Sequence, residues 1–164
     1  MGNAILYRMA SGIPGDISRQ SQATVESIAL NSALPFPGYG LFGKIAAGKF
    51  VPLTTGDAAT AAYGLLVRPY PTAGGAASDP LGTSTPPASG IGDVMRRGYM
   101  TVKNNAGTPA LNGQVYVRVA AAAAGKPIGG IEAAADSTNT IAITGAIFTN
   151  AGDANGNVEI AYNI

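Results

Sequence analysis

The sequence of 164 residues contains no cysteine, no histidine and no tryptophan. Without cysteine, neither a disulfide bond nor a thiolate zinc site can form. Without histidine, the chain lacks the most common general base and metal ligand, and Ser-His-Asp or Cys-His catalysis is impossible. These absences exclude the most familiar catalytic centres. We therefore expect a protein that works without enzymatic chemistry, a metal or a cofactor.

Charged side chains are scarce as well. They make up 12% of the residues, and the formal net charge is only +1. The basic excess of a nucleic-acid binder is missing. No apolar run approaches the roughly 18 residues of a membrane-spanning helix, and no signal-peptide pattern is visible. We expect neither nucleic acid nor a membrane as partner, and we expect synthesis in a cytoplasm.

The nine carboxylates are scattered along the chain rather than paired. A fold can bring two distant carboxylates together, as in glycosidases, but nothing in the spacing favours such a pair. An enzyme based on these acids is therefore the third and weakest interpretation. The acidic residues are Asp16, Glu26, Asp57, Asp79, Asp93, Glu132, Asp136, Asp153 and Glu159.

Short runs rich in β-branched and aromatic residues, separated by 23 glycines and 11 prolines, predict β-strands. In the clearest run, Val115, Val117 and Val119 alternate with Tyr116 and Arg118, which predicts that only one face is buried. No segment keeps the helical period of 3.6 convincingly. We predict an all-β protein, a small antiparallel β-barrel or jelly-roll-like sandwich. The expected strands are 24–30, 40–45, 49–53, 62–69, 93–103, 114–120, 128–133, 140–148 and 157–162.

The connections between these runs carry turn signals. Asn112-Gly113 and Asn155-Gly156 suit hairpin turns, and we expect 141–148 to pair with 157–162. The alanine run at 120–125 is too short for a free helix, so we interpret it as a strand end passing into a tight connection. Residues 71–92 are of low complexity and predict a surface loop, mobile or ordered by a partner. We predict a single β domain over residues 24–164.

Two motifs imitate ligand sites. "GYGLFG" at 38–43 has the glycine spacing of a dinucleotide-binding loop, but that loop needs a strand before it and a helix after it. "DANGNVE" at 153–159 alternates oxygen-bearing residues like a calcium loop, but the glycine of such a loop is out of place and its final glutamate is missing. A turn leading into a strand and a hairpin turn explain these residues better.

The N-terminal stretch "ASGIPGDISRQ" at 10–20 has no period that would bury it against its own core. Ile13 and Ile17 are large apolar side chains among residues that break regular structure, and Asp16 and Arg19 offer charges for pairing. We predict an extended arm over residues 1–23 that becomes ordered on a neighbouring protein. On this interpretation, deletion of residues 1–20 leaves the β domain folded and weakens only its attachment.

A second candidate patch is "VMRRGYMTVKN" at 94–104, where Arg96, Arg97 and Lys103 lie near Tyr99. Single-stranded nucleic acid is one interpretation. We prefer a solvated edge or a patch that forms salt bridges to another protein. Arginine suits the second role, because its planar guanidinium group matches a carboxylate. With the arm, the residues expected to bind a partner are Arg8, Ile13, Asp16, Ile17, Arg19, Arg96 and Arg97.

Several phrases of the chain, in order, resemble the structural cement or capsid decoration proteins of tailed bacteriophages. They are "GIPGDISR", "GYGLFGKI", "AAYGLLVRPYP", "GQVYVRVA", "GKPIGGIEAA" and "NTIAITGAIFTNAGDANGNVEIAYNI". The resemblance implies a small β-barrel or jelly-roll-like protein made in the host cytoplasm. It implies binding, as a dimer or trimer, to the outer surface of the assembled capsid, where such proteins bridge major capsid protein subunits. The family has no catalytic residues to carry over.

A tail-fibre or receptor-binding β module is the alternative. Carbohydrate binding by β proteins usually uses exposed aromatic side chains, and this chain has no tryptophan. A structural protein that binds an assembled capsid is therefore the preferred hypothesis.

Overall fold

Nine β-strands and three single-turn 3-10 helices form within residues 12–69 and 85–164, which are the residues that the structure, a computed structural model, describes. The expected all-β class is therefore confirmed. Within these residues, no helix is long and apolar enough to cross a bilayer. The strands are β1 Thr24–Leu30, β2 Phe42–Ala46, β3 Lys49–Pro52, β4 Gly64–Leu66, β5 Gly90–Lys103, β6 Gln114–Arg118, β7 Ile131–Glu132, β8 Thr140–Phe148 and β9 Asn157–Tyr162, and the 3-10 helices are η1 Gln20–Gln22, η2 Ala59–Ala61 and η3 Ser137–Asn139.

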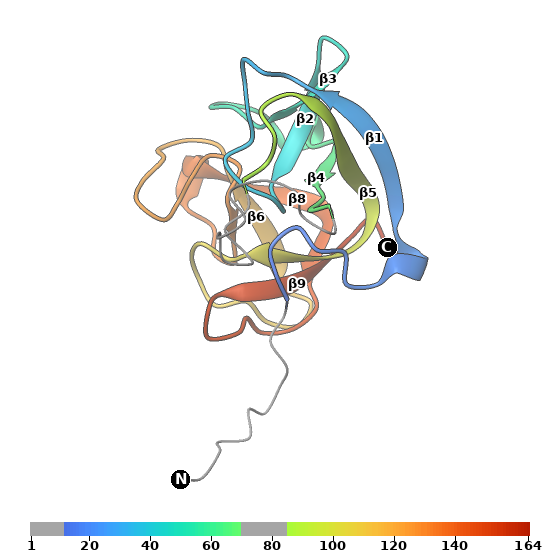
Figure 1. Cartoon of the computed structure of the whole chain (residues 1–164). Helices are drawn as coiled ribbons and strands as arrows, with labels where there is room; N and C mark the ends of the chain where they lie inside the picture. Colours follow the sequence, from blue (N-terminus) through green and yellow to red (C-terminus); the bar gives the residue numbers. More distant parts are fainter. Residues whose placement is uncertain (1–11, 70–84) are drawn as a thin grey trace, which may run out of the picture.

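The long strand β5 belongs to two rings of strands. Its first half pairs with β1 and β4, and the pairing order β1-β3-β2-β4-β5 returns to β1. Its second half pairs with β9, and the order continues through β8 and β6 to β7. A bridge between Asn104 and Ile131 then joins β7 to the end of β5. In Figure 1, β5 runs beside β1 and continues beside β9.

Almost all of these pairings are antiparallel, as expected for a small barrel. The exceptions are the single pair Leu30 with Phe50, where β1 meets β3 in parallel, and the parallel bridge of Asn104 with Ile131. The sheet is therefore mixed, although the sequence pattern led us to expect antiparallel pairing alone. Both parallel contacts lie where a ring closes.

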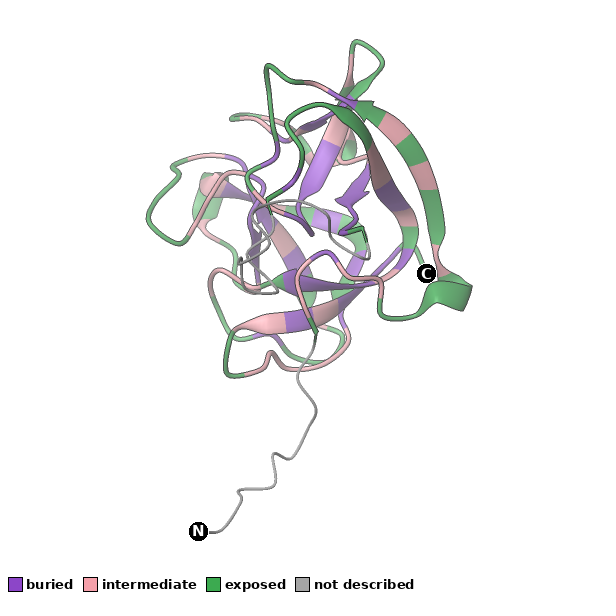
Figure 2. Cartoon of the chain, viewed as in Figure 1, coloured by how far each residue is buried: buried purple, intermediate pink, exposed green. Residues whose placement is uncertain are grey.

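Two apolar cores fill the space that the strands enclose. The period of two places Met100 and Val102 of β5 in the larger core, where Val117 and Ile160 also lie fully buried. A smaller core gathers around Phe50, whose ring stacks on Phe36 with centroids 4.9 Å apart. Figure 2 shows the buried residues on the inner strands and the exposed ones along the outer loops.

Each predicted strand overlaps one strand of the structure, and the predicted ends differ from the observed ends by at most three residues. The hairpin is confirmed, because β8 and β9 pair antiparallel. The alanine run at 120–125 forms no helix and follows the end of β6, as expected. Residues 90–92 belong to β5, so their assignment to a low-complexity loop was wrong. Residues 85–89 form neither helix nor strand, as expected for a loop, and residues 71–84 lie outside the described residues.

Two of the three glycines of "GYGLFG", Gly40 and Gly43, serve close packing, and the motif is a turn that leads into strand β2, which confirms the turn interpretation. Gly40 has a φ of +73°, and a Cβ there would lie 2.8 Å from the backbone nitrogen of Gly15. Gly43 lies inside β2, where a Cβ would lie 2.6 Å from the carbonyl oxygen of Val51. Strands β2 and β3, rather than a helix, come directly after the motif, so the context of a dinucleotide-binding loop is missing.

Gly43→Ala is expected to lower the free energy of unfolding by about 1–3 kcal/mol, because the added methyl group overpacks the wall of the smaller core. Gly38→Ala is the matched control, since the nearest heavy atom to a Cβ there is 4.0 Å away. We expect this control to change stability by less than about 0.5 kcal/mol. Urea unfolding of both variants measures the difference. Equal losses in the two would contradict the close packing around Gly43.

Candidate interaction surface

Residues 12–18 lie along the second half of β5, on the strand edge that β9 does not occupy. The amide of Gly15 donates to the carbonyl of Thr101, whose own amide donates to the carbonyl of Asp16. The amide of Ser18 donates to the carbonyl of Tyr99 at 3.1 Å. The described part of the expected arm is thus hydrogen-bonded to its own sheet and covers an edge that would otherwise expose unpaired backbone groups.

Packing reinforces these hydrogen bonds. The side chain of Ile17 packs against the larger core, and Gly15 is buried where a Cβ would lie 2.5 Å from the Cβ of Tyr39. Our expectation that this stretch does not pack on its own core was therefore wrong for residues 12–18. The cause is long-range pairing with β5, which local periodicity does not report. Residues 1–11, including Arg8, lie outside the described residues.

A polar cluster fixes the end of this segment. The guanidinium group of Arg19 lies 3.8 Å from the ring centroid of Tyr99 and forms an ion pair of 2.9 Å with Glu159 of β9. The hydroxyl groups of Ser18 and Thr149 also donate to the Glu159 carboxylate. Burial alone would raise the pKa of Glu159, but the hydrogen bonds from Ser18, Thr149 and Arg19 outweigh it and lower the pKa. Glu159 is therefore an ionised anchor for the segment.

An apolar groove of about 380 Å³ lies beside this cluster. Tyr99, Ala161 and Ile147 are neighbours across β5, β9 and β8, and they form part of the groove lining on the outer face of the sheet. Leu111 and Ile164 complete its apolar lining and are 69% and 56% exposed. Large apolar side chains gathered in a solvent-facing groove are typical of a surface that binds another protein.

The two arginines of the second predicted patch have different surroundings. Arg96 lies over the ring of Tyr63 at 3.6 Å and pairs with Glu26 at 3.4 Å, so it is engaged within its own chain. A hydrogen bond from Tyr63, more than the charge of Arg96, lowers the pKa of Glu26. Arg97 is exposed, and it takes part in none of the ion pairs found among the described residues. Binding of a partner by these two residues, or by Ile13, Asp16, Ile17 and Arg19, stays a prediction.

Sequence alternation gave the wrong environment for Arg118. It shares a strand face with Tyr116, which we expected to be the less buried face, yet its side chain is only 2% exposed. Its guanidinium group pairs with Glu132 at 2.5 Å and with Asp136 at 2.6 Å. The hydrogen bonds that Arg118 donates to these carboxylates raise its pKa. The two acids come from β7 and the loop after it, so no local pattern could have revealed the cluster.

Residues 153–156 of "DANGNVE" lie in the turn between β8 and β9, and residues 157–159 begin β9. The carboxylate of Asp153 accepts hydrogen bonds from the amides of Asn155 and Asn157. Over residues 12–69 and 85–164, no group of three or more acidic side chains gathers in a way that could hold a metal ion. The residues of this motif therefore close a turn, as the hairpin interpretation predicts.

The described residues thus form an all-β protein whose surface carries an apolar groove and an anchored segment. Residues 2–162 match the family model described as XM1 gp53 minor capsid protein. The chain belongs to this family of phage minor capsid proteins, and it has a structural role in the phage capsid and a place in the virion. The resemblance to phage capsid proteins is thereby confirmed.

A solved structure of similar fold supports the same architecture. A chain in the capsid of Myoviridae phage XM1 matches with a TM-score of 0.67 and 19% sequence identity. The match covers 99% of this chain and 97% of that chain. At this identity the likeness shows the fold alone. No curated protein matches the sequence.

Proposed function

We propose that this protein is a capsid decoration, or cement, protein. It binds the outer surface of the assembled capsid and stabilises the shell by bridging major capsid protein subunits. Family membership supports a capsid role, and one observation carries the finer assignment. The groove with Leu111, Ile147 and Ile164 leaves large apolar side chains in water on the face that also bears the anchored segment.

Such a role requires contact area rather than catalysis. An exposed apolar side chain contributes about 25 cal/mol per Å² when a partner covers it. Many copies on one shell reinforce each other, so each contact can be weak. On this proposal, the protein is no enzyme, is made in the host cytoplasm and contacts neither nucleic acid nor membrane. The capsid family favours this role over the tail-fibre alternative.

Particles that lack the protein provide the direct test. Purified protein is mixed with undecorated capsids from a phage deleted for its gene, and bound protein is measured after sedimentation. We expect saturable binding, and electron microscopy should place the added density on the outside of the shell. Binding only to tails, or only to the inner surface, would refute the proposal.

Leu111→Asp and Ile147→Asp are each expected to weaken binding to undecorated capsids by tenfold or more, a loss of about 1.4 kcal/mol. Each change places a charge in the groove and removes apolar contact area. Ile91→Asp is the matched control, because Ile91 is 72% exposed but belongs to the first half of β5 and does not line the groove. Sedimentation with capsids measures all three. Equal losses of binding in the control and the groove variants would show that the groove is not part of the interface.

A further inference from the structure

Arg68 is a buried cation that lies two residues after the end of β4. The residue is only 7% exposed, and its backbone amide donates to the carbonyl of Gly15. The guanidinium carbon lies 5.5 Å from the ring centroid of Tyr39. The Nη2 atom is buried, and no hydrogen-bond acceptor for it lies among the described residues. A buried donor without an acceptor costs free energy.

Three other arginines have the carboxylate partners that Arg68 lacks. Arg118, which is also buried, pairs with two carboxylates, Arg19 pairs with Glu159, and Arg96 pairs with Glu26. No carboxylate lies within ion-pair distance of Arg68 in the described part of the chain. Asp16 interacts with Arg68 only at longer range. Burial raises the pKa of Asp16, and the positive charge of Arg68 opposes that rise.

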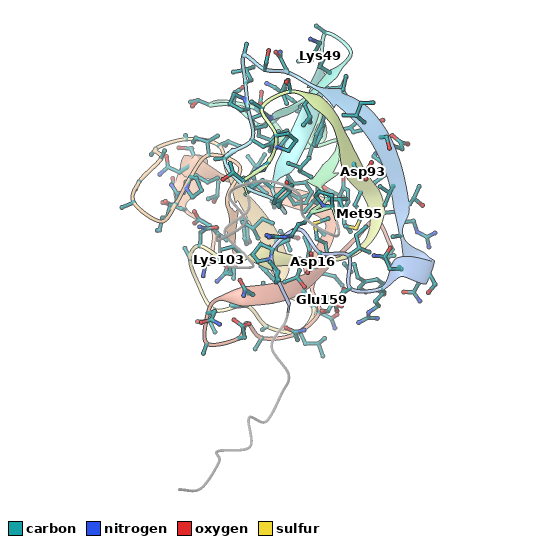
Figure 3. All side chains as sticks on the ribbon, in the orientation of Figure 1. Asp16, Lys49, Asp93, Met95, Lys103 and Glu159 are labelled. Atoms are coloured by element: carbon teal, nitrogen blue, oxygen red, sulfur yellow. The ribbon has the colours of Figure 1, made fainter. Side chains whose placement is uncertain are left out.

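Arg68 lines a pocket of about 320 Å³, together with Pro14, Pro37, Tyr39, Leu41 and Asn105. Lys103 also contributes to the lining, and its Nζ atom donates to the carbonyl of Asn155. Figure 3 shows Asp16, Lys103 and Glu159 gathered where the N-terminal segment crosses β5 and β9. The pocket thus combines apolar walls with two cationic side chains.

We propose that this pocket binds a carboxylate presented by an acidic side chain of a partner protein. The planar guanidinium group offers paired donors to a carboxylate, and the proline and tyrosine walls suit the apolar atoms around it. Identification of that partner as the capsid shell rests on the function proposed above. A phosphate group would meet mostly apolar walls, and it serves as a comparison in the test.

Stability distinguishes a binding role from a structural one. Arg68→Met removes a buried charge that forms no ion pair within residues 12–69 and 85–164, and methionine retains favourable contact with an aromatic ring. We expect the Tm to rise by about 2–4 °C, whereas Arg118→Met, which breaks paired charges, lowers it. A fall in Tm for Arg68→Met would make Arg68 a structural residue and overturn the proposal.

Binding is tested by NMR titration of the full chain with the blocked peptide acetyl-Gly-Asp-Gly-amide. We expect saturable shifts at the amides of Gly38 and Asn105. Acetyl-Gly-Asn-Gly-amide should give none, inorganic phosphate should bind more weakly, and Arg68→Met should weaken peptide binding at least tenfold. Equal binding of both peptides, or unchanged binding by Arg68→Met, would overturn the proposal. Tighter binding of phosphate would do so as well.

Two further arms separate the possible sources of the carboxylate. Asp79 carries the one acidic side chain in the sequence of residues 70–84, and Asp79→Asn removes its charge. Peptide binding that appears only in this variant would mean that Asp79 of the same chain competes for the pocket, and it would overturn the proposal. Arg68→Met is also mixed with undecorated capsids, where we expect binding at least tenfold weaker than that of the parent protein. Unchanged capsid binding would overturn the shell as partner. Absence of capsid binding by the parent protein would refute only the decoration function.

Discussion

Arg118→Met should lower the free energy of unfolding by about 3–5 kcal/mol, because it leaves the buried carboxylate of Glu132 without a counter-ion. Glu132 is 1% exposed, and its two oxygens accept from the Nε and Nη2 atoms of Arg118 at 2.5 and 3.1 Å. Because Glu132 is buried, desolvation of an unpaired carboxylate at this position is costly. Urea unfolding at neutral pH measures the loss.

The double variant Arg118→Met with Glu132→Leu is the control for this experiment. Removal of both charges eliminates the uncompensated carboxylate, and apolar replacements of a buried pair are often neutral or stabilising. We expect the double variant to recover most of the stability that the single variant loses. Both variants also remove the partner of Asp136, but water can solvate that carboxylate, because its side chain is 41% exposed. Equal instability of single and double variants would show that shape, rather than charge, explains the loss.

The second large effect concerns the N-terminal segment. Deletion of residues 1–20 removes four backbone hydrogen bonds that join Gly15, Asp16 and Ser18 to β5 and Arg68, each worth about 1 kcal/mol. The deletion also exposes core atoms under Ile17 and removes the Arg19 ion pair with Glu159. We therefore expect a loss of several kcal/mol, which replaces the sequence-based expectation of an independent β domain.

Deletion of residues 1–11 alone is the matched control, because it retains all of these contacts. We expect the shorter deletion to unfold within about 0.5 kcal/mol of the full chain. Thermal and urea unfolding of the two truncated chains measure the difference. A longer deletion that is as stable as the full chain would show that residues 12–20 contribute nothing to the fold and would restore the free-arm hypothesis.

The strands could be predicted from the sequence because their signals are local. The alternation in "QVYVRVA" and the turn at Asn155-Gly156 depend on neighbouring residues, and β6 and the β8–β9 hairpin appear where those patterns place them. Asn112-Gly113 also lies at a turn, but it closes no hairpin, because β6 pairs with β7 and β8 rather than with β5. Strand ends were less accurate, since pairing partners decide them. The extension of β5 back to Gly90 follows from its pairing with Leu30, which no local pattern contains.

The candidate site was harder to predict because distant segments create it. Leu111, Ile147 and Ile164 come from a loop, a strand and the residues after β9, and only the fold brings them to one groove. Arg118 and Arg68 are ordinary cations in the sequence, and burial alone distinguishes them. Ile17 and Arg19 were selected as anchors for a partner, which stays a prediction, and the contacts that the structure shows for them lie within their own chain.

The continuity of β5 has a mechanical consequence. Each ring uses a different half of this one strand as a wall, so neither core remains enclosed when the strand is pulled away. Gly98, at the junction of the halves, has a φ of +140° and lets the backbone turn from one ring into the other without a break. A load applied to either ring therefore reaches the other through covalent bonds.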